Sequence, residues 1–105
     1  ADDYLRINFR GRTVKAGGKE VHLTKLEFEL LKYLAERSGK PISRSELIDN
    51  VWGYEGGDLS DAAVNVAITK LRSKIEPDPP NPRYIHSMHG FGYYFKIKRN
   101  REDSK

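Results

Sequence analysis

The chain of 105 residues contains no cysteine, and no apolar run in it reaches the length that a membrane-spanning helix requires. Without cysteine it can form no disulfide bond, carry out no thiolate chemistry and build no zinc site with cysteine ligands. No signal peptide opens the sequence either. These absences fit a cytoplasmic protein, and we expect that location for this chain.

A residue pattern that would support catalysis or metal binding is also missing. No nucleophile, general base and orienting group occur together, so we predict that the chain is not an enzyme. On a strand, His86 and His89 would point to opposite faces, and no nearby carboxylate completes a metal site. The stretch Gly90-Phe91-Gly92 is too short for a phosphate-binding fingerprint. We therefore expect no metal and no cofactor.

The positive charge of the sequence is distributed unevenly. The chain has a net charge of +4, with 37% hydrophobic and 32% charged residues, as is typical of one globular domain. Residues 1–61 hold 10 Lys+Arg and 11 Asp+Glu, whereas residues 62–101 hold 8 Lys+Arg and 2 Asp+Glu. A basic excess confined to one part of a domain favours a polyanionic partner.

The N-terminal residues predict a small antiparallel sheet. Apolar and polar residues alternate over residues 4–9, which indicates a half-buried strand. Residues 13–14 and 21–23 are short strand candidates on either side of the glycine pair 17–18.

Two capping patterns then predict two helices. Thr24 and Glu27 have the spacing of a capping box, and the helix that they start should end in a left-handed cap at Gly39. Ser43 and Glu46 repeat the same spacing at the start of a second, shorter helix.

The second half of the chain predicts a third helix and a β-hairpin. Asp58 or Ser60 can cap this helix, whose apolar stripe has helical spacing over residues 60–74. The proline-rich stretch 76–82 cannot continue it. Residues 84–95 have the glycine turn and aromatic residues of a hairpin. Three helices, the last of them exposed, followed by a hairpin define a winged helix-turn-helix, an α+β fold that binds DNA.

At this point the sequence resembles the effector domain of OmpR/PhoB-type response regulators, from about residue 5 to residue 95. Any single matching piece is weak, but all of them in this order form a specific signal. The matching positions are Leu23-Thr24, Glu27, Leu30-Leu31, Leu34, Ser43-Arg44, Leu47, Val51-Trp52-Gly53, Val64-Asn65-Val66, Ile68, Leu71-Arg72-Ser73-Lys74-Ile75 and Gly90-Phe91-Gly92-Tyr93.

The resemblance implies a fold and a mode of binding. It implies an N-terminal antiparallel sheet, a three-helix core and a C-terminal hairpin, the wing. The third helix would enter the major groove of DNA, and the wing would touch the minor groove or the backbone. In activators of this kind a loop, here with Tyr54, Glu55 and Asp58, would face RNA polymerase.

The resemblance also implies a domain organisation. Residues 1–105 would form a single winged-helix domain with a core over about 4–98 and a basic tail over 99–105. The family's phosphorylatable receiver domain does not fit in a chain of this length. The operator would consist of two half-sites in direct repeat. The isolated domain would be mainly monomeric, and it would dimerise on DNA or through a receiver domain.

Most of the residues that we expect at the DNA lie on the third helix. Small side chains there permit close approach, and Asn65 could pair with adenine or bond a phosphate. Lys70, Arg72 and Lys74 would neutralise phosphates, and His89 at the tip of the wing could donate to one. The full set is Trp52, Ala63, Asn65, Val66, Thr69, Lys70, Arg72, Ser73, Lys74, Ser87, His89 and Tyr93.

Two other interpretations remain open. The chain could be the DNA-binding head of a membrane-anchored one-component regulator, and only the rest of the protein would distinguish this case. It could also be a protein-interaction module that contacts RNA polymerase or a receiver domain and binds DNA weakly. The salt dependence of duplex binding separates a DNA-binding domain from an interaction module.

Overall fold

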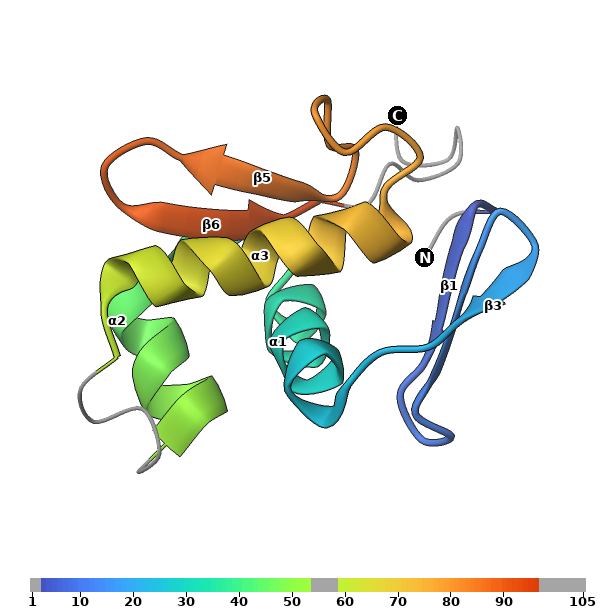
Figure 1. The fold of residues 1–105 in the computed structure, drawn as a ribbon, viewed down its shortest axis with the longest axis horizontal. Coiled ribbons are helices and arrows are strands. Elements are labelled where there is room, and N and C mark those ends of the chain that lie inside the picture. The colour runs from blue at the N-terminus through green and yellow to red at the C-terminus, as the bar shows by residue number, and fades with distance from the viewer. Residues whose placement is uncertain (1–2, 54–58, 97–105) are drawn as a thin grey trace.

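The computed structural model describes residues 3–53 and 59–96, which form two small sheets around a set of helices (Figure 1). The first sheet contains β1 (Leu5–Asn8), β2 (Thr13–Ala16) and β3 (Lys19–Val21), antiparallel and paired in that order. The glycines 17–18 join β2 to β3 with φ of 62° and 82°, a conformation that glycine adopts at little steric cost. The small sheet is confirmed, but the strand expected over 21–23 starts two residues earlier.

Helix α1 (Lys25–Glu36) begins with the predicted capping box. The Thr24 hydroxyl accepts from the Glu27 backbone N–H at 3.1 Å, and the Glu27 carboxylate accepts from the Thr24 N–H at 2.9 Å. Gly39 does have a left-handed φ of 85°, but it lies beyond the end of the helix. Its N–H donates to the Phe95 carbonyl at 2.7 Å, so this glycine joins the chain to the second sheet.

The second helical segment follows a very short strand. After β4 (Ile42–Ser43) come α2 (Arg44–Leu47) and a π-helical turn, η1 (Ile48–Trp52). The N–H of Gly53 donates to the Ile48 carbonyl and closes that wider turn.

Only half of the second predicted capping box forms. The Ser43 hydroxyl accepts from the Glu46 N–H at 3.0 Å, as expected. The Glu46 carboxylate instead accepts from the hydroxyl of Tyr33 at 2.6 Å. Burial and this carboxylate raise the pKa of Tyr33. The contact ties α1 to α2.

Helix α3 (Asp61–Ile75) is capped by Ser60, whose hydroxyl accepts from the Ala63 N–H at 3.3 Å. Asp58, the other candidate cap, lies outside the described residues. The apolar stripe of α3 faces inward as predicted. Its members are fully buried: Val64, Ile68, Leu71 and Ile75.

Glu76, directly after α3, anchors the start of the hairpin. This residue is buried, and its carboxylate accepts from the backbone N–H groups of Arg83 at 2.6 Å, Tyr84 at 3.1 Å and Ile85 at 2.9 Å. The proline-rich loop over 77–82 is therefore closed by a side chain, an anchor that we did not predict from the sequence.

The hairpin belongs to a sheet of three strands. Strands β5 (Ile85–Met88) and β6 (Gly92–Phe95) are antiparallel, and β4 pairs with the other edge of β6. Gly90 turns the hairpin with a φ of 72°. Gly92 has a different role, because a Cβ added there would lie 2.0 Å from the Ile42 carbonyl oxygen. The expected hairpin is confirmed, but the two-residue strand β4 was not predicted.

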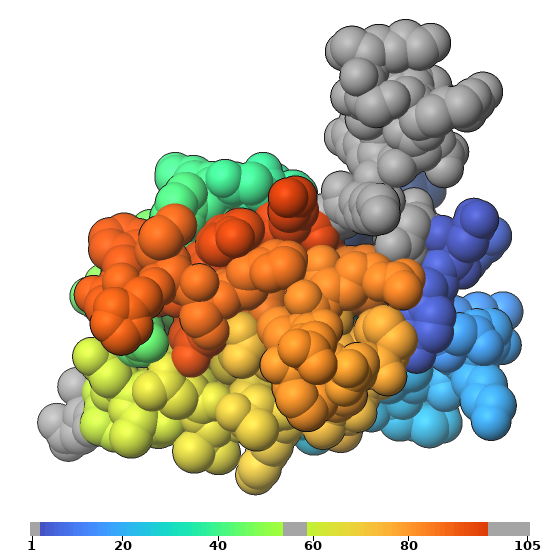
Figure 2. Space-filling view, turned by 90° about the horizontal axis from the view of Figure 1, so that it is seen from above, coloured from blue at the N-terminus to red at the C-terminus, as the bar shows by residue number. Residues whose placement is uncertain are grey.

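Helix α3 passes through the middle of the molecule (Figure 1). The hairpin lies along one side of it, and α1 and α2 lie on the other. Figure 2, seen from the hairpin side, shows the orange hairpin beside the yellow α3. The expected winged helix-turn-helix is thus confirmed, and one long face of α3 remains uncovered.

Candidate nucleic-acid interface

The uncovered side of α3 is a row of exposed residues. Val66 has 53% of its surface exposed, a large fraction for an apolar residue on a central helix. We call this row the outer face of α3; it consists of Ala62, Val66, Thr69, Lys70 and Ser73. Three of these were expected to contact DNA through polar groups and one through an apolar surface.

The hydroxyl groups of the outer face are bonded within α3. Thr69 donates to the Asn65 carbonyl at 2.9 Å, and Ser73 donates to the Lys70 carbonyl at 2.6 Å. Each hydroxyl oxygen can still accept a hydrogen bond from a partner. The helix therefore offers short polar groups, a methyl-bearing Val66 and one cation at its surface.

Arg72 is tied to the hairpin. Its Nε and Nη2 donate to the Ile85 carbonyl at 3.0 and 2.8 Å, and Nη2 also donates to the Ser87 hydroxyl at 3.1 Å. The guanidinium is half-buried, and burial lowers the pKa of Arg72. From the sequence we expected Arg72 to neutralise a DNA phosphate; in the structure it also fastens α3 to β5.

Lys74 is also held by another part of the chain. Its Nζ lies 2.6 Å from Oε1 of Glu27, which is buried at the start of α1. Burial would raise the pKa of Glu27, but the hydrogen bonds from Lys74 and Thr24 outweigh it, so this pKa lies below its ordinary value of 4.5. Two of the three cations expected on α3 therefore have partners within the protein.

The Glu27 contacts should make stability depend on pH. A lowered folded-state pKa means that the carboxylate stabilises the fold fully above pH 4.5 and that this is lost as pH falls through the folded-state pKa. We expect Glu27→Gln to destabilise the domain at pH 7, and the difference from the natural protein should shrink below about pH 4.5. Urea unfolding at a series of pH values measures this difference in the free energy of unfolding.

The control for this experiment is Glu29→Gln. Glu29 pairs with Arg12 at 2.7 Å, but both side chains are substantially exposed, and such pairs contribute little to stability. If both variants lost the same free energy of unfolding at every pH, the role given to Glu27 would be wrong.

A polar cluster joins α2, α3 and the hairpin around Tyr93. Asn65 Oδ1 accepts from Arg44 Nε at 2.9 Å and from the Tyr93 hydroxyl at 2.5 Å. The Arg44 and Arg72 guanidinium carbons lie 5.3 and 5.4 Å from the centre of the Tyr93 ring. With Ser87, which Arg72 contacts, we call these residues the Tyr93 cluster.

The cluster gives two residues contacts within the protein that the sequence did not predict. Tyr93 was expected at the DNA, but it is only 5% exposed and serves to pack the hairpin against α3. Arg44 was not among the expected contacts, although its position after a helix cap next to the third helix could have suggested it. Both follow from contacts between segments that are distant in the sequence.

Two hollows flank the outer face. One, of about 280 Å³, lies toward α1 and is lined by Trp52, Val66 and Lys70 among others. Trp52 is half-buried and packs against the core. Its exposed part borders this hollow. The other, of about 550 Å³, lies toward the hairpin and includes Thr69 and Ser87.

The tip of the wing is exposed. His89 follows β5 in the turn, and Phe91 beside it is 47% exposed. His86 stacks on Tyr94 with ring centres 5.1 Å apart and bonds the Arg83 carbonyl, so it does not converge with His89. Within residues 3–53 and 59–96, no group of three or more possible ligands could hold a metal ion.

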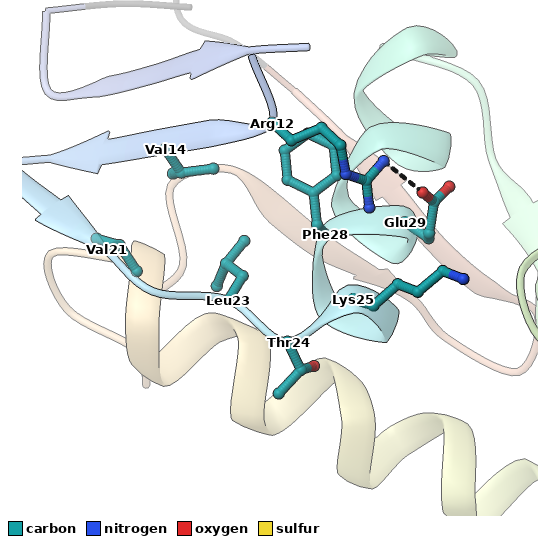
Figure 3. Close-up of a pocket in the computed structure, with 8 residues that line it drawn as sticks. All are labelled: Arg12, Val14, Val21, Leu23, Thr24, Lys25, Phe28 and Glu29. Carbon is teal, nitrogen blue, oxygen red and sulfur yellow. Dashed lines mark hydrogen bonds and ion pairs between the residues drawn. The ribbon is translucent and has the colours of Figure 1, made fainter. Parts of the chain in front are cut away.

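A third hollow, of about 350 Å³, lies away from the outer face, between the first sheet and α1 (Figure 3). Arg12 crosses it to Glu29 and lies 4.5 Å from the centre of the Phe28 ring. The remaining lining is largely aliphatic, including Val14 and Leu23.

None of the helices in the described part of the chain is long and apolar enough to cross a membrane.

Residues 18–95 match the family described as "Transcriptional regulatory protein, C terminal". Probable transcriptional regulator ycf27 of Cyanophora paradoxa is 39% identical over 98 residues, which is 92% of this chain and 41% of the relative. The chain thus spans about two fifths of the length of that curated relative.

Two solved structures are similar over nearly the whole chain. Response regulator DrrB of Thermotoga maritima, an OmpR/PhoB homologue, is 40% identical with a TM-score of 0.82, over 92% of this chain and 44% of that one. The RstA DNA-binding domain of Klebsiella pneumoniae, in complex with the RstA box, is 32% identical with a TM-score of 0.79, over 91% and 94%. The chain belongs to the family of C-terminal domains of transcriptional regulatory proteins and is of the OmpR/PhoB type, as its sequence pattern suggested.

Proposed function

We propose that this domain binds duplex DNA as the output domain of a response regulator, with the outer face of α3 in the major groove and the hairpin against the backbone. The observation that carries the proposal is the uncovered outer face itself, with Val66 53% exposed between two hollows. The similarity to the RstA domain solved with its box supports it. Short side chains let the helix approach base edges, and a Val66 methyl group can contact a thymine methyl.

Most of the expected contact residues divide into three groups under this proposal. Val66, Thr69, Lys70 and Ser73 meet the groove directly, and Ala63 borders the hollow beside Trp52. Ser87 and His89 lie on the exposed wing. Arg72, Lys74 and Tyr93 support the interface from within the protein, through contacts to the hairpin and to α1.

Further parts of the proposal concern the intact protein. The chain belongs to a family of transcription regulators, which is not an enzyme class. This membership supports the proposals that the domain acts by binding, without catalysis, and that the protein works in the cytoplasm. Tyr54, Glu55 and Asp58, proposed to face RNA polymerase, lie outside the described residues, as does the proposed basic tail. A receiver domain, direct-repeat half-sites and a mainly monomeric isolated domain remain proposals.

Binding should depend strongly on salt and on Lys70. If Lys70 and the other groups at the interface neutralise about three phosphates in all, log K should fall with log salt at a slope of about −2.7. Lys70→Ala should weaken binding to all duplexes and make the slope less steep by about one. Random-site selection first provides a duplex that the domain binds. Fluorescence anisotropy of this duplex, carrying a label, then measures the affinity and its salt slope.

The matched control is Lys15→Ala, because Lys15 is exposed on β2 in the first sheet. It should change neither affinity nor slope. If Lys70→Ala behaves like this control while its circular dichroism stays native, α3 is not in the groove. A flat salt response of the natural domain would support an interaction module.

A further inference from the structure

The Tyr93 cluster determines which way the Asn65 side-chain amide faces. A guanidinium has no hydrogen-bond acceptor, so Arg44 Nε can only donate, and it lies 2.9 Å from the amide of Asn65. The amide atom that faces Arg44 must therefore be the oxygen. The Tyr93 hydroxyl donates to the same oxygen at 2.5 Å. Both lone pairs of Oδ1 are thus occupied by groups of the protein.

The nitrogen of the same amide is left to interact outside the protein. Asn65 is exposed on α3, between the outer face and the hairpin. Among the described residues, no hydrogen-bond partner of Nδ2 is present. The side chain therefore offers two N–H donors and no acceptor to a ligand.

We infer that Asn65 contacts DNA as a donor only and recognises a hydrogen-bond acceptor, an inference that rests on the DNA-binding function proposed above. Suitable acceptors are purine N7, guanine O6, thymine O4 and phosphate oxygens. The paired contact of asparagine with adenine, which the sequence suggested, requires Oδ1 to accept from the adenine amino group. In this domain Oδ1 is already held by Arg44 and Tyr93.

Arg44 acts here as a positioning residue. Turning the amide over would place an N–H group against Arg44 Nε, leaving two donors facing each other. The arginine is half-buried and lies over the face of the buried Tyr93, which limits its freedom to move away. Three elements, α2, α3 and β6, therefore hold the amide in one orientation.

The test removes single atoms from the DNA and measures coupling to Asn65. Random-site selection with the natural domain first yields a duplex, and its positions are then replaced one at a time. The replacements are 7-deazapurines for N7, 2-aminopurine in place of guanine for O6, 4-thiothymine for O4 and methylphosphonate at single phosphates. Unsubstituted purine in place of adenine removes the adenine amino group. Affinities are measured for the natural domain and for Asn65→Ala, so that each replacement completes a double-mutant cycle.

Loss of one acceptor should weaken the natural domain by roughly five-fold, and Asn65→Ala should be insensitive to that same replacement. Coupling to a base acceptor assigns the contact to a base edge, and coupling to a methylphosphonate assigns it to the backbone; both support the inference. Coupling to the adenine amino group overturns it, as does an absence of coupling at every position. If no duplex is selected at all, the proposed function itself fails.

Two substitutions of Arg44 test the positioning role. Arg44→Lys keeps a group that can only donate, so the coupling pattern should remain that of the natural domain. Arg44→Gln can donate or accept, which frees the Asn65 amide to turn over, and coupling to adenine amino groups should then appear. Circular dichroism confirms that both variants fold. An unchanged coupling pattern in a folded Arg44→Gln variant would show that Arg44 does not set the orientation.

Discussion

Replacing Glu76 with alanine should lower the free energy of unfolding by about 3–5 kcal/mol. Its buried carboxylate accepts from three consecutive backbone N–H groups, those of Arg83, Tyr84 and Ile85. Without it these donors lose this acceptor at the point where the hairpin begins. The donors of Tyr84 and Ile85 are buried, and each buried donor that loses its acceptor costs about 1–3 kcal/mol. Urea unfolding followed by Trp52 fluorescence measures the loss.

Asp78→Ala is the matched control for this prediction. Asp78 is an exposed acid in the same loop, and its side chain bonds only Asn81 at 3.0 Å. Its removal should cost about 0.5–1 kcal/mol. The loss of stability in Glu76→Gln should lie between those of Glu76→Ala and Asp78→Ala, because the amide keeps one acceptor oxygen. If Glu76→Ala is no more destabilised than Asp78→Ala, the carboxylate does not anchor the hairpin.

Gly92→Ala should destabilise the domain by about 3 kcal/mol or more and separate β4 from β6. A Cβ at this position would lie 2.0 Å from the Ile42 carbonyl oxygen and 2.9 Å from the Ser43 Cα. These are backbone atoms, which cannot rotate away as a flexible side chain would. The strands must move apart, and the hairpin then loses the β4 edge that holds it to the start of α2.

A second glycine separates this steric effect from loss of glycine flexibility. Gly18 has a φ of 82° but open space where its Cβ would stand. Gly18→Ala should therefore cost about 1 kcal/mol through backbone strain alone. Unfolding curves and hydrogen exchange at β4 compare the two variants. Equal losses would mean that the close approach of β4 and β6 contributes nothing special.

The sequence was sufficient for features whose causes are local. The capping box of Thr24 and Glu27 spans three residues, and its two hydrogen bonds form as expected. The buried stripe of α3 follows from the helical period, and the glycine turn of the hairpin follows from a few neighbouring residues. Together with the family pattern, these local signals predicted the winged helix-turn-helix and the exposed position of Val66 and Lys70.

The state of the other charged residues on α3 could not be predicted in this way. A lysine or arginine off the apolar stripe has the same local sequence whether it faces solvent or a partner. Lys74 meets Glu27, 47 residues earlier in the chain, and Arg72 meets the hairpin, 13 residues later. One signal did exist for Glu76, since an acid at the C-terminal end of a helix opposes the helix dipole and needs a compensating partner.

The sequence by itself determined the order of the first sheet, the three helices and the hairpin, the inward face of each helix, the family and the basic character of the second half. Only the tertiary structure decided which of the polar side chains have partners within the protein. It buried Tyr93, occupied Arg72 and Lys74, added strand β4 and turned the Asn65 amide toward Arg44. The reason is physical: capping and periodicity act within a few residues, whereas hydrogen bonds between α2, α3 and the hairpin exist only after distant segments have packed together.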